Sequence, residues 1–353
     1  MAALGLNRVR KTRDRCFSKS FVNRGRPRRA APTVRSMQLL EYTPAFDVNA
    51  AAAIAGEHFG IRARAQALPS ERDQNFLLTN QAGGKFVLKI ANRLESREFL
   101  EAQNAVLKYL ERRVSICQKL LPSVSGEEIV SVKSHFVRLV HYLPGVPLAK
   151  VGTHSSGLLH DLGRKLGQVA QALADFDHPA VHRDFHWDLA NGNRVVDEFA
   201  SLIDNASLRE LVLKCRFVPP EGLRRSVIHG DANDYNLLVD PQSMTVTGLI
   251  DFGDMVYSYT VGDLAIAIAY VILDKTDPHA AAEQIVRGYR SEFALLDEEL
   301  EALWPLVRLR LAMSVCLAAH QLRQQPDNKY LRISQQAIEQ NLPRIYADEK
   351  GFS

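Results

Sequence analysis

The stretch Ile228-His-Gly-Asp-Ala-Asn-Asp-Tyr-Asn-Leu-Leu-Val-Asp240, followed by Val246-Thr-Gly-Leu-Ile-Asp-Phe-Gly-Asp254, carries the most informative pattern of this chain. Its two polar clusters are separated by the apolar run 236–239, and a second run, 249–250, leads into the later cluster. Short apolar runs bounded by polar residues and glycine are typical of β-strands. The sequence therefore predicts a hairpin that brings the two acidic clusters together.

That geometry suits phosphoryl transfer from a nucleotide. One carboxylate must orient the attacking hydroxyl and accept its proton, while an amide and a second carboxylate hold Mg²⁺ on the phosphates. We assign Asp231 as the base, and Asn236 and Asp251 as the metal ligands. Turns also use Asn, Asp and Gly, but the order of both clusters around one hairpin favours the phosphotransfer site.

A site of this type also needs a lysine on a strand and a helical glutamate to position it. The strand-like run Phe86-Val-Leu-Lys-Ile90 supplies Lys89, and the helical spacing of apolar residues over 94–113 supplies the helix. Glu98 and Glu101 are the candidate partners of the lysine. We prefer Glu101, which shares a face with apolar residues, although a solvated glutamate is the alternative for both.

The turn Leu68-Pro-Ser-Glu-Arg-Asp-Gln-Asn-Phe76 lies where a protein kinase would carry a glycine-rich loop, and it has no glycine. We therefore expect backbone amides and the side chain of Ser70 or Asn75 to meet the phosphates. Arg138, on the strand before the expected hinge, is a further candidate for nucleotide contact. The chain has no Ala-Pro-Glu segment after Asp251, which argues against a protein substrate.

The His-Gly-Asp, Asn and Asp-Phe-Gly set resembles the aminoglycoside phosphotransferase and choline kinase superfamily of small-molecule kinases. Further stretches are similar to its hydroxylysine kinase subfamily and bacterial relatives; they are 71–76, 86–92, 137–145, 182–188 and 250–255. The resemblance covers about 40–345. It implies an α+β, protein-kinase-like bilobal fold, and γ-phosphoryl transfer from GTP or ATP, with Mg²⁺, to the 5-hydroxyl of 5-hydroxy-L-lysine.

The chain divides into three parts on this interpretation: a basic leader at 1–36, a nucleotide-binding lobe at 37–143, and a catalytic and substrate-binding lobe at 144–353. The first lobe is predicted to hold a helix from Asp47 to about Phe59, then mostly antiparallel strands near 61–68, 75–80, 85–91 and 135–143. Pro144-Gly-Val-Pro147 is the expected hinge. The second lobe is predicted to be mainly helical, near 155–176, 196–215, 260–274, 279–293, 297–323 and 328–346.

Residues around the mouth of the site must select the acceptor. A hydroxylated basic amino acid presents two ammonium groups, which suit carboxylates and an aromatic face, and a carboxylate, which suits arginine. The candidates with these properties are Arg183, Trp187, Asp188, Asp234 and Asp254. Helix capping and core packing are the alternative roles for them. His229 and Asp263 are expected to brace the catalytic loop rather than to react.

The formal net charge of the whole chain, +4, depends on the leader. Residues 1–36 hold eleven basic residues and one acidic residue, whereas the rest of the chain holds 33 basic and 39 acidic residues. The leader is either an organelle presequence or an artefact of the start site, with Met37 the alternative start. The four cysteines show no metal or redox spacing. We expect reduced thiols in a cytoplasmic protein, or a mitochondrial matrix protein if the leader is a presequence, with neither nucleic acid nor membrane as a partner.

Two alternatives stay open. The first is another kinase of the superfamily, acting on homoserine, choline, ethanolamine or an aminoglycoside. The second is a catalytically inactive, kinase-like binding module, against which the joint presence of Lys89, Asp231, Asn236 and Asp251 argues. The choice between GTP and ATP and the oligomeric state are left open as well.

Overall fold

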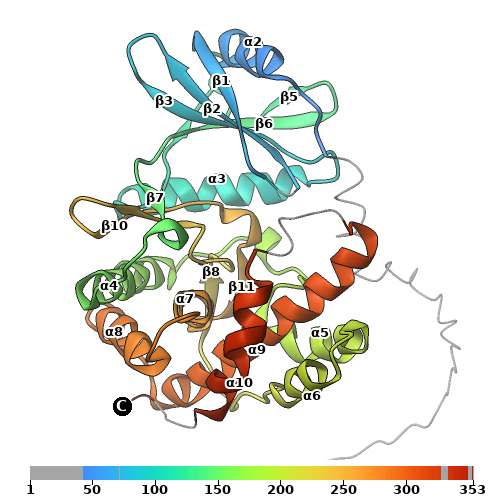
Figure 1. The fold of residues 1–353 in the computed structure, drawn as a ribbon. Helices are drawn as coiled ribbons and strands as arrows, with labels where there is room; N and C mark the ends of the chain where they lie inside the picture. Colours follow the sequence, from blue (N-terminus) through green and yellow to red (C-terminus); the bar gives the residue numbers. More distant parts are fainter. Residues whose placement is uncertain (1–42, 71, 327–332, 349–351, 353) are drawn as a thin grey trace, which may run out of the picture. The chain divides into compact units, whose positions relative to one another are not determined.

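The computed structural model describes residues 43–348 and Phe352, except 71 and 327–332 (Figure 1). All of them belong to one compact unit of the chain. The predictions made for 1–36 lie outside the described residues. Two lobes can be followed in the ribbon, a sheet-rich one formed by the earlier part of the chain and a mainly helical one formed by the rest. The expected α+β bilobal fold is confirmed.

Helix α2 (Val48–Phe59) opens the described chain. Its cap, Asp47, accepts a hydrogen bond from the amide of Ala50, and Gly60 ends the helix in the left-handed conformation (φ 68°). An antiparallel sheet follows, in the order β1-β2-β3-β6-β4 with β5 also on β6. Its strands are β1 (Ala63–Leu68), β2 (Gln74–Asn80), β3 (Lys85–Ile90), β4 (Leu120–Leu121), β5 (Val130–Val132) and β6 (His135–His141).

Helix α3 (Arg97–Glu111) lies beside this sheet (Figure 1). Ser96 caps it by accepting from the amide of Phe99. Its buried face includes Phe99, Val106 and Leu110, whose helical spacing points one stripe of the helix at the core. The helix therefore has a second side that faces solvent, and the predicted site residue Glu101 lies on it.

The segment predicted as a hinge enters the second lobe as a strand. Strand β7 (Val146–Pro147) pairs with β9 (Leu237–Asp240), and β9 pairs with β10 (Thr245–Leu249). The β9–β10 pair is the hairpin that the sequence predicts. A short ladder of β8 (Arg225–Ile228) and β11 (Val256–Tyr259) lies beneath it. The first polar cluster thus lies between β8 and β9, and the second follows β10, so the β9–β10 pair joins the two clusters.

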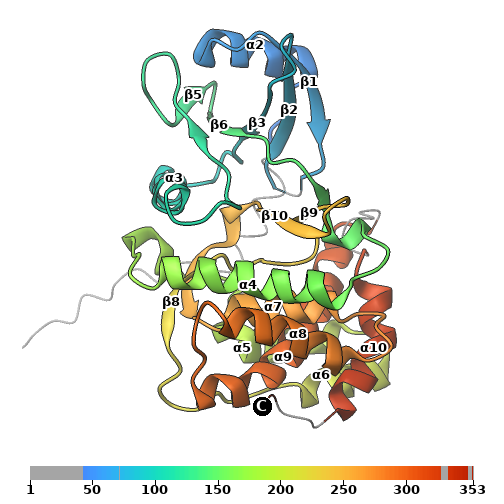
Figure 2. The same ribbon diagram turned by 90° about the vertical axis from the view of Figure 1, so that its left-hand side faces the viewer.

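The second lobe contains α4 (Ser156–Leu173), α5 (Gly192–Phe199), α6 (Ala206–Lys214), α7 (Gly262–Val271), α8 (Pro278–Arg290), α9 (Asp297–Gln324) and α10 (Gln335–Ala347). The single helix expected over 196–215 is wrong. The chain leaves helix near Ile203, and Asn205 starts α6 by accepting from the amide of Leu208, so a capping residue splits the segment. Figure 2 shows α4 in front of α7 and alongside α8.

Glycines allow α4 and α8 to touch. A Cβ built on Gly163 would lie 1.8 Å from the carbonyl oxygen of Ile285, and one on Gly288 would lie 1.9 Å from that of His160.

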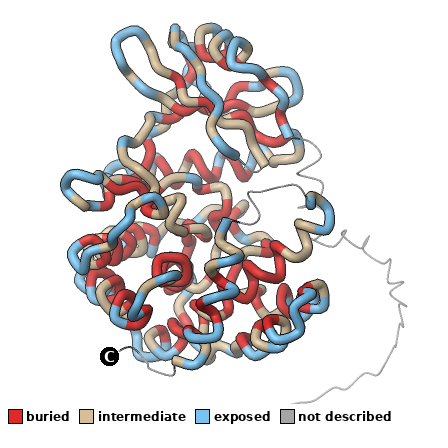
Figure 3. Tube along the Cα trace, viewed as in Figure 1, coloured by how far each residue is buried: buried red, intermediate tan, exposed pale blue. Residues whose placement is uncertain are grey.

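Helix α9 is long and apolar enough to cross a bilayer, but 83% of its most apolar window is buried inside the protein. It is a core helix, as its colouring in Figure 3 shows. Of the described cysteines, Cys117, Cys215 and Cys316 are free and buried.

Candidate active site

The two polar clusters are joined through backbone and ring contacts. The amide of Ile250 donates to the carbonyl of Asn236 over 3.0 Å. The ring nitrogen Nε2 of His229 lies 3.0 Å from the carbonyl oxygen of Ile250, and its ring packs edge-on against Phe252 at 4.6 Å. His229 thus connects the catalytic loop to the segment that carries Asp251, which agrees with its expected structural role.

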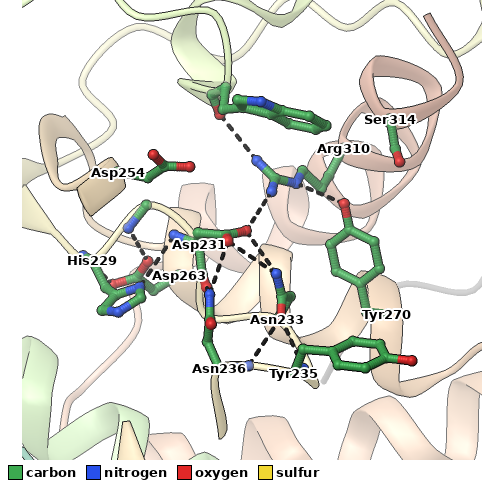
Figure 4. A network of polar contacts seen from close by, with 12 residues as sticks. His229, Asp231, Asn233, Tyr235, Asn236, Asp254, Asp263, Tyr270, Arg310 and Ser314 are labelled. Carbon is green, nitrogen blue, oxygen red and sulfur yellow. Dashed lines mark hydrogen bonds and ion pairs between the residues drawn. The ribbon is translucent and has the colours of Figure 1, made fainter. Parts of the chain in front are cut away.

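Asp263 holds the other side of this loop. Its two carboxylate oxygens accept from the amides of His229 (2.7 Å) and Gly230 (2.8 Å). Gly230 has φ +81°, and a Cβ there would lie 2.3 Å from the carbonyl oxygen of Asp254. Only glycine fits that position. Helix α7 therefore fixes the loop just before Asp231, as Figure 4 shows.

Asp231 lies at the centre of a polar network (Figure 4). The side-chain amide of Asn233 donates to both of its carboxylate oxygens at 3.0 Å, and that of Asn236 donates to Oδ2 at 2.9 Å. Arg310 of α9 forms an ion pair with Oδ1 at 2.8 Å. These donors leave the carboxylate in one orientation, directed toward the pocket described below.

Burial raises the pKa of Asp231 to about 8, because an ionised carboxylate loses solvation there. The charge of Arg310 opposes this rise, whereas the neighbouring carboxylates of Asp254 and Asp251 add to it. A carboxyl with a pKa close to the working pH can both hold and release a proton, which is the property that a general acid–base group needs.

Lys89 of β3 and Asp251 form an ion pair, with 3.2 Å between Nζ and Oδ1. The charge of Lys89 lowers the pKa of Asp251, so this carboxylate is ionised. Asp251 also adopts a left-handed backbone (φ 69°), which is costly for a residue other than glycine. The structure thus brings together Lys89, Asp251, Asn236 and Asp231 from the two lobes.

The pair expected between Lys89 and Glu101 does not form. Glu101 accepts from Arg97 Nε at 3.0 Å, and both side chains are half exposed. Its position on α3 lies on the solvent side, because the core-facing stripe passes through its neighbours, Leu100 and Ala102. Lys89 pairs with Asp251 instead.

The expectation that Arg138 faces the nucleotide is not met either. Arg138 pairs with Lys89 across β6 and β3, but its buried guanidinium donates to Asn104 Oδ1 (2.9 Å) and Gln103 Oε1 (2.7 Å). A buried guanidinium needs acceptors, and the side-chain amides of α3 supply them. Burial lowers the pKa of Arg138. The residue joins the helix to the sheet.

The turn between β1 and β2 holds the expected pair Ser70 and Asn75, whose side chains meet at 3.3 Å. A residue of the same turn, Arg72, reaches across to Asp254 of the other lobe with 2.5 Å between the charged atoms. The sequence predicts that Asp254 either contacts the substrate or caps the following turn. The ion pair to Arg72 gives it a further role that sequence reasoning did not foresee.

A cavity of about 130 Å³ opens beside Asp231. Three of the five predicted acceptor residues line it: Trp187, Asp234 and Asp254. Two do not. Asp188 accepts from the amide of Ala190 (2.9 Å) and from the hydroxyl of Ser258, as a cap does.

Arg183, the other predicted acceptor residue outside the cavity, stacks on Phe99 (3.9 Å) and Phe185 (4.2 Å) and donates to the carbonyl of Gly253 at 3.1 Å. These contacts hold it beside the turn after Asp251. Its actual position is therefore nearer the Asp-Phe-Gly segment than the acceptor cavity.

Sequence reasoning missed Arg310, which lines the same cavity. Its guanidinium lies over the ring of Trp187 at 4.5 Å, donates to the Trp187 carbonyl (3.1 Å) and reaches the Tyr270 hydroxyl (3.3 Å). The side chain is 2% exposed. An arginine within the apolar middle of a long helix is itself a signal, because a buried charge requires a partner.

The residues present fit a magnesium ion. Asn236 uses Nδ2 to hold Asp231, so its oxygen is left for a hard cation, and the ionised Asp251 supplies a carboxylate. Within the described ranges no group of three or more His, Cys, Asp or Glu could hold a metal by itself. Two protein ligands are expected for Mg²⁺ that also binds phosphates.

Comparison with known proteins defines the class. The phosphotransferase enzyme family (APH) matches residues 64–308, and the chain belongs to this family. It is accordingly a phosphotransferase, and as a small-molecule kinase it takes its phosphoryl group from a nucleotide.

The relatives that resemble it in sequence include hydroxylysine kinases and, at 25% identity, a homoserine kinase of Zymomonas mobilis. The hydroxylysine kinase of Mus musculus is 32% identical, covering 86% of this chain and 90% of the relative. That of Danio rerio is 31% identical, covering 79% and 85%. Among solved structures, the amicoumacin kinase hAmiN in complex with AMP-PNP, Ca²⁺ and Ami superposes with a TM-score of 0.66, covering 87% of this chain and 96% of that one. At 16% identity it supports the fold alone.

Proposed function

We propose that this chain transfers the γ-phosphoryl group of GTP or ATP to the 5-hydroxyl of 5-hydroxy-L-lysine. The observation that carries the proposal is the cavity beside Asp231, in which a candidate base, two further carboxylates and a buried arginine converge. The similarity to hydroxylysine kinases supports the choice of acceptor.

The acceptor chemistry matches the lining of the cavity. The carboxylates of Asp234 and Asp254 suit the two ammonium groups of hydroxylysine, and the indole face of Trp187 suits a cation as well. The guanidinium of Arg310 holds Trp187, Tyr270 and the base Asp231 in place around the acceptor, because each of its nitrogens already has a partner. Burial raises the pKa of Asp234 to about 6, so this group is still largely ionised at neutral pH.

Asp231 would orient the 5-hydroxyl and accept its proton as the oxygen attacks the γ-phosphorus. The bond from that phosphorus to the bridging oxygen breaks, and its electron pair leaves with the nucleoside diphosphate. Lys89 is placed to bind phosphate oxygens while it positions Asp251. Mg²⁺, held by Asn236 and Asp251, would supply charge neutralisation on the phosphates when bound.

The test is a coupled assay of nucleoside diphosphate release, with GTP and with ATP, over a panel of acceptors. The panel contains 5-hydroxy-L-lysine, L-lysine, homoserine, choline, ethanolamine and an aminoglycoside. We expect turnover with 5-hydroxy-L-lysine, none with L-lysine, which lacks the hydroxyl, and a phosphate monoester signal in ³¹P NMR. Turnover with another acceptor in its place would overturn the assignment of hydroxylysine but keep the phosphotransferase.

The matched variant is Asp231→Asn, which keeps the shape of the side chain and removes the base. We expect its turnover to fall by roughly 10²–10⁴-fold, the range of general-base catalysis, with the dissociation constant of the Mg²⁺-nucleotide changed little. Near-normal turnover would contradict the role of Asp231. A protein that binds nucleotide but turns over no acceptor would support the inactive binding module.

A further inference from the structure

The turn between β1 and β2 places the positively charged side chain of Arg72 at the active site. This turn has no glycine over 68–76. Arg72 extends from it to Asp254, 182 residues further along the chain, and the two charged atoms are 2.5 Å apart. The contact joins a loop of the first lobe to the turn directly after Asp251.

Arg72 also lies close to the phosphate side of the site. A Cβ built on Gly253 would be 3.2 Å from Asp251 Oδ1 and 3.8 Å from Arg72 Nη2, so the guanidinium and that carboxylate border the same small space. Asp254 lines the acceptor cavity together with Asp231. Arg72 is therefore located between the two sides that a transferring phosphoryl group must join.

The ion pair is suited to exchange. The side chain of Arg72 is 30% exposed, so its guanidinium can be reached from outside, whereas that of Asp254 is 11% exposed and holds it from the protein side. A triphosphate offers the guanidinium several oxygens with more negative charge, in the planar geometry that arginine prefers. A guanidinium already held at the edge of the site needs only a small movement to make that contact.

We propose that Arg72 is a catalytic residue that binds the γ-phosphoryl oxygens of the nucleotide, and that Asp254 holds it when no triphosphate is bound. In the transfer step the acceptor oxygen bonds to the γ-phosphorus, the bridging P–O bond breaks toward the diphosphate, and the proton passes to Asp231. Arg72 keeps its proton throughout and balances the charge on the moving group. The inference rests on the proposed phosphoryl transfer but not on the identity of the acceptor.

The experiment compares triphosphate with diphosphate binding in the absence of acceptor. Calorimetric titrations with Mg²⁺-AMP-PNP and with Mg²⁺-ADP, or their guanine counterparts, are made on the wild type, Arg72→Ala, Arg72→Lys and Asp254→Asn. We expect Arg72→Ala to weaken binding of the triphosphate analogue at least tenfold and of the diphosphate less than threefold, with partial recovery in Arg72→Lys. Its turnover should fall by roughly 10³-fold, as for other phosphate-binding arginines.

Asp254→Asn separates phosphate contact from a simple link between lobes. If Arg72 binds the γ-phosphate, this variant releases the arginine and leaves triphosphate binding equal to or tighter than the wild type. If the link alone matters, both variants weaken the two nucleotides alike, which overturns the proposal. Turnover of Arg72→Ala within threefold of the wild type would overturn it too.

Arg164→Ala is the matched control. Arg164 pairs with Asp161 of the same helix, α4, at 2.6 Å, with side chains 35% and 13% exposed, which resembles the Arg72 pair in length and exposure. It lines neither the acceptor cavity nor the Asp251 turn, so both nucleotides should bind as to the wild type. Because no acceptor is present in the titrations, the result stands even if the acceptor is an alcohol other than hydroxylysine.

Discussion

Arg310 and Asp231 are 79 residues apart in sequence and 2.8 Å apart in the structure. The arginine comes from the interior of α9, and the aspartate from the loop after β8. The same guanidinium also contacts Trp187 and Tyr270 (Figure 4). One buried charge thus sets the orientation of the candidate base and the floor of the acceptor cavity, so its removal should change both proton affinity and acceptor binding.

The pH dependence of turnover should report this contact. The charge of Arg310 lowers the pKa of Asp231, so Arg310→Met should raise that pKa further and shift the acidic limb of the kcat profile toward alkaline pH, by roughly one unit or more. Arg310→Lys keeps a positive charge and should shift the limb less. The measurement is kcat from pH 5 to 10 with circular dichroism of each variant, and an acidic limb that stays in place in Arg310→Met would contradict the contact.

Asp251 should act on nucleotide binding rather than on proton transfer. Asp251→Asn leaves Lys89 without its carboxylate and removes the negative charge of one metal ligand. We expect the Mg²⁺-nucleotide dissociation constant to rise at least tenfold, about 1.4 kcal/mol, in calorimetric titrations. Asp204→Asn, at a fully exposed side chain, is the control and should bind as the wild type. Unchanged Mg²⁺ dependence in Asp251→Asn would remove this residue from the metal site.

Glu101 should be dispensable. Glu101→Gln breaks only an exposed pair with Arg97 one helical turn away, which is worth about 0.3–0.5 kcal/mol. Its kcat and its KM for the nucleotide should stay within about twofold of the wild type, since such a free energy corresponds to about a twofold change. A loss of turnover comparable to that of Lys89→Ala would instead support the lysine–glutamate pair that the sequence predicts.

Gln103 should matter for stability. Gln103→Leu deprives the buried guanidinium of Arg138 of an acceptor at 2.7 Å, which should lower the free energy of unfolding by about 1.5–3 kcal/mol. Urea denaturation checks this, with Glu98→Ala on the same helix as the control. If Gln103→Leu unfolds at the wild-type midpoint, the link from Arg138 to α3 is not a structural support.

Glycines at the α4–α8 contact should resist substitution. Gly288→Ala or Gly163→Ala places a methyl group within 2 Å of a backbone oxygen of the other helix, so the helices must separate, at a cost of about 1–3 kcal/mol or more. Gly157→Ala, also in α4, meets only a side chain at 3.8 Å. It should be neutral or stabilise by up to about 1 kcal/mol. Equal melting temperatures for all three variants would contradict the close contact.

The features that the sequence predicted well depend on neighbours in the chain. The β9–β10 hairpin, the strand carrying Lys89 and the cap at Asp47 are each encoded within a few residues, by apolar spacing, turn residues or a side chain that bonds a nearby amide. One feature encoded locally was nevertheless predicted wrongly. The helix expected over 196–215 is interrupted, because Asn205 caps a new helix within that segment.

The features that were missed depend on partners far away in sequence. Arg310 and Arg72 reach Asp231 and Asp254 across 79 and 182 residues. Glu101 turned out to face solvent, because the rotation of α3 against the sheet is set by packing and by the Arg138 contact. No local pattern specifies such a rotation.

The sequence by itself thus determined the hairpin and which acidic and amide groups flank it, because strand periodicity and turn chemistry act over a few residues. Tertiary structure alone decided which charges pair: Lys89 with Asp251, Arg72 with Asp254, and Arg310 with Asp231. The reason is physical, since a charge removed from water takes the partner that packing brings within reach, and that partner is set by how the lobes and helices come together.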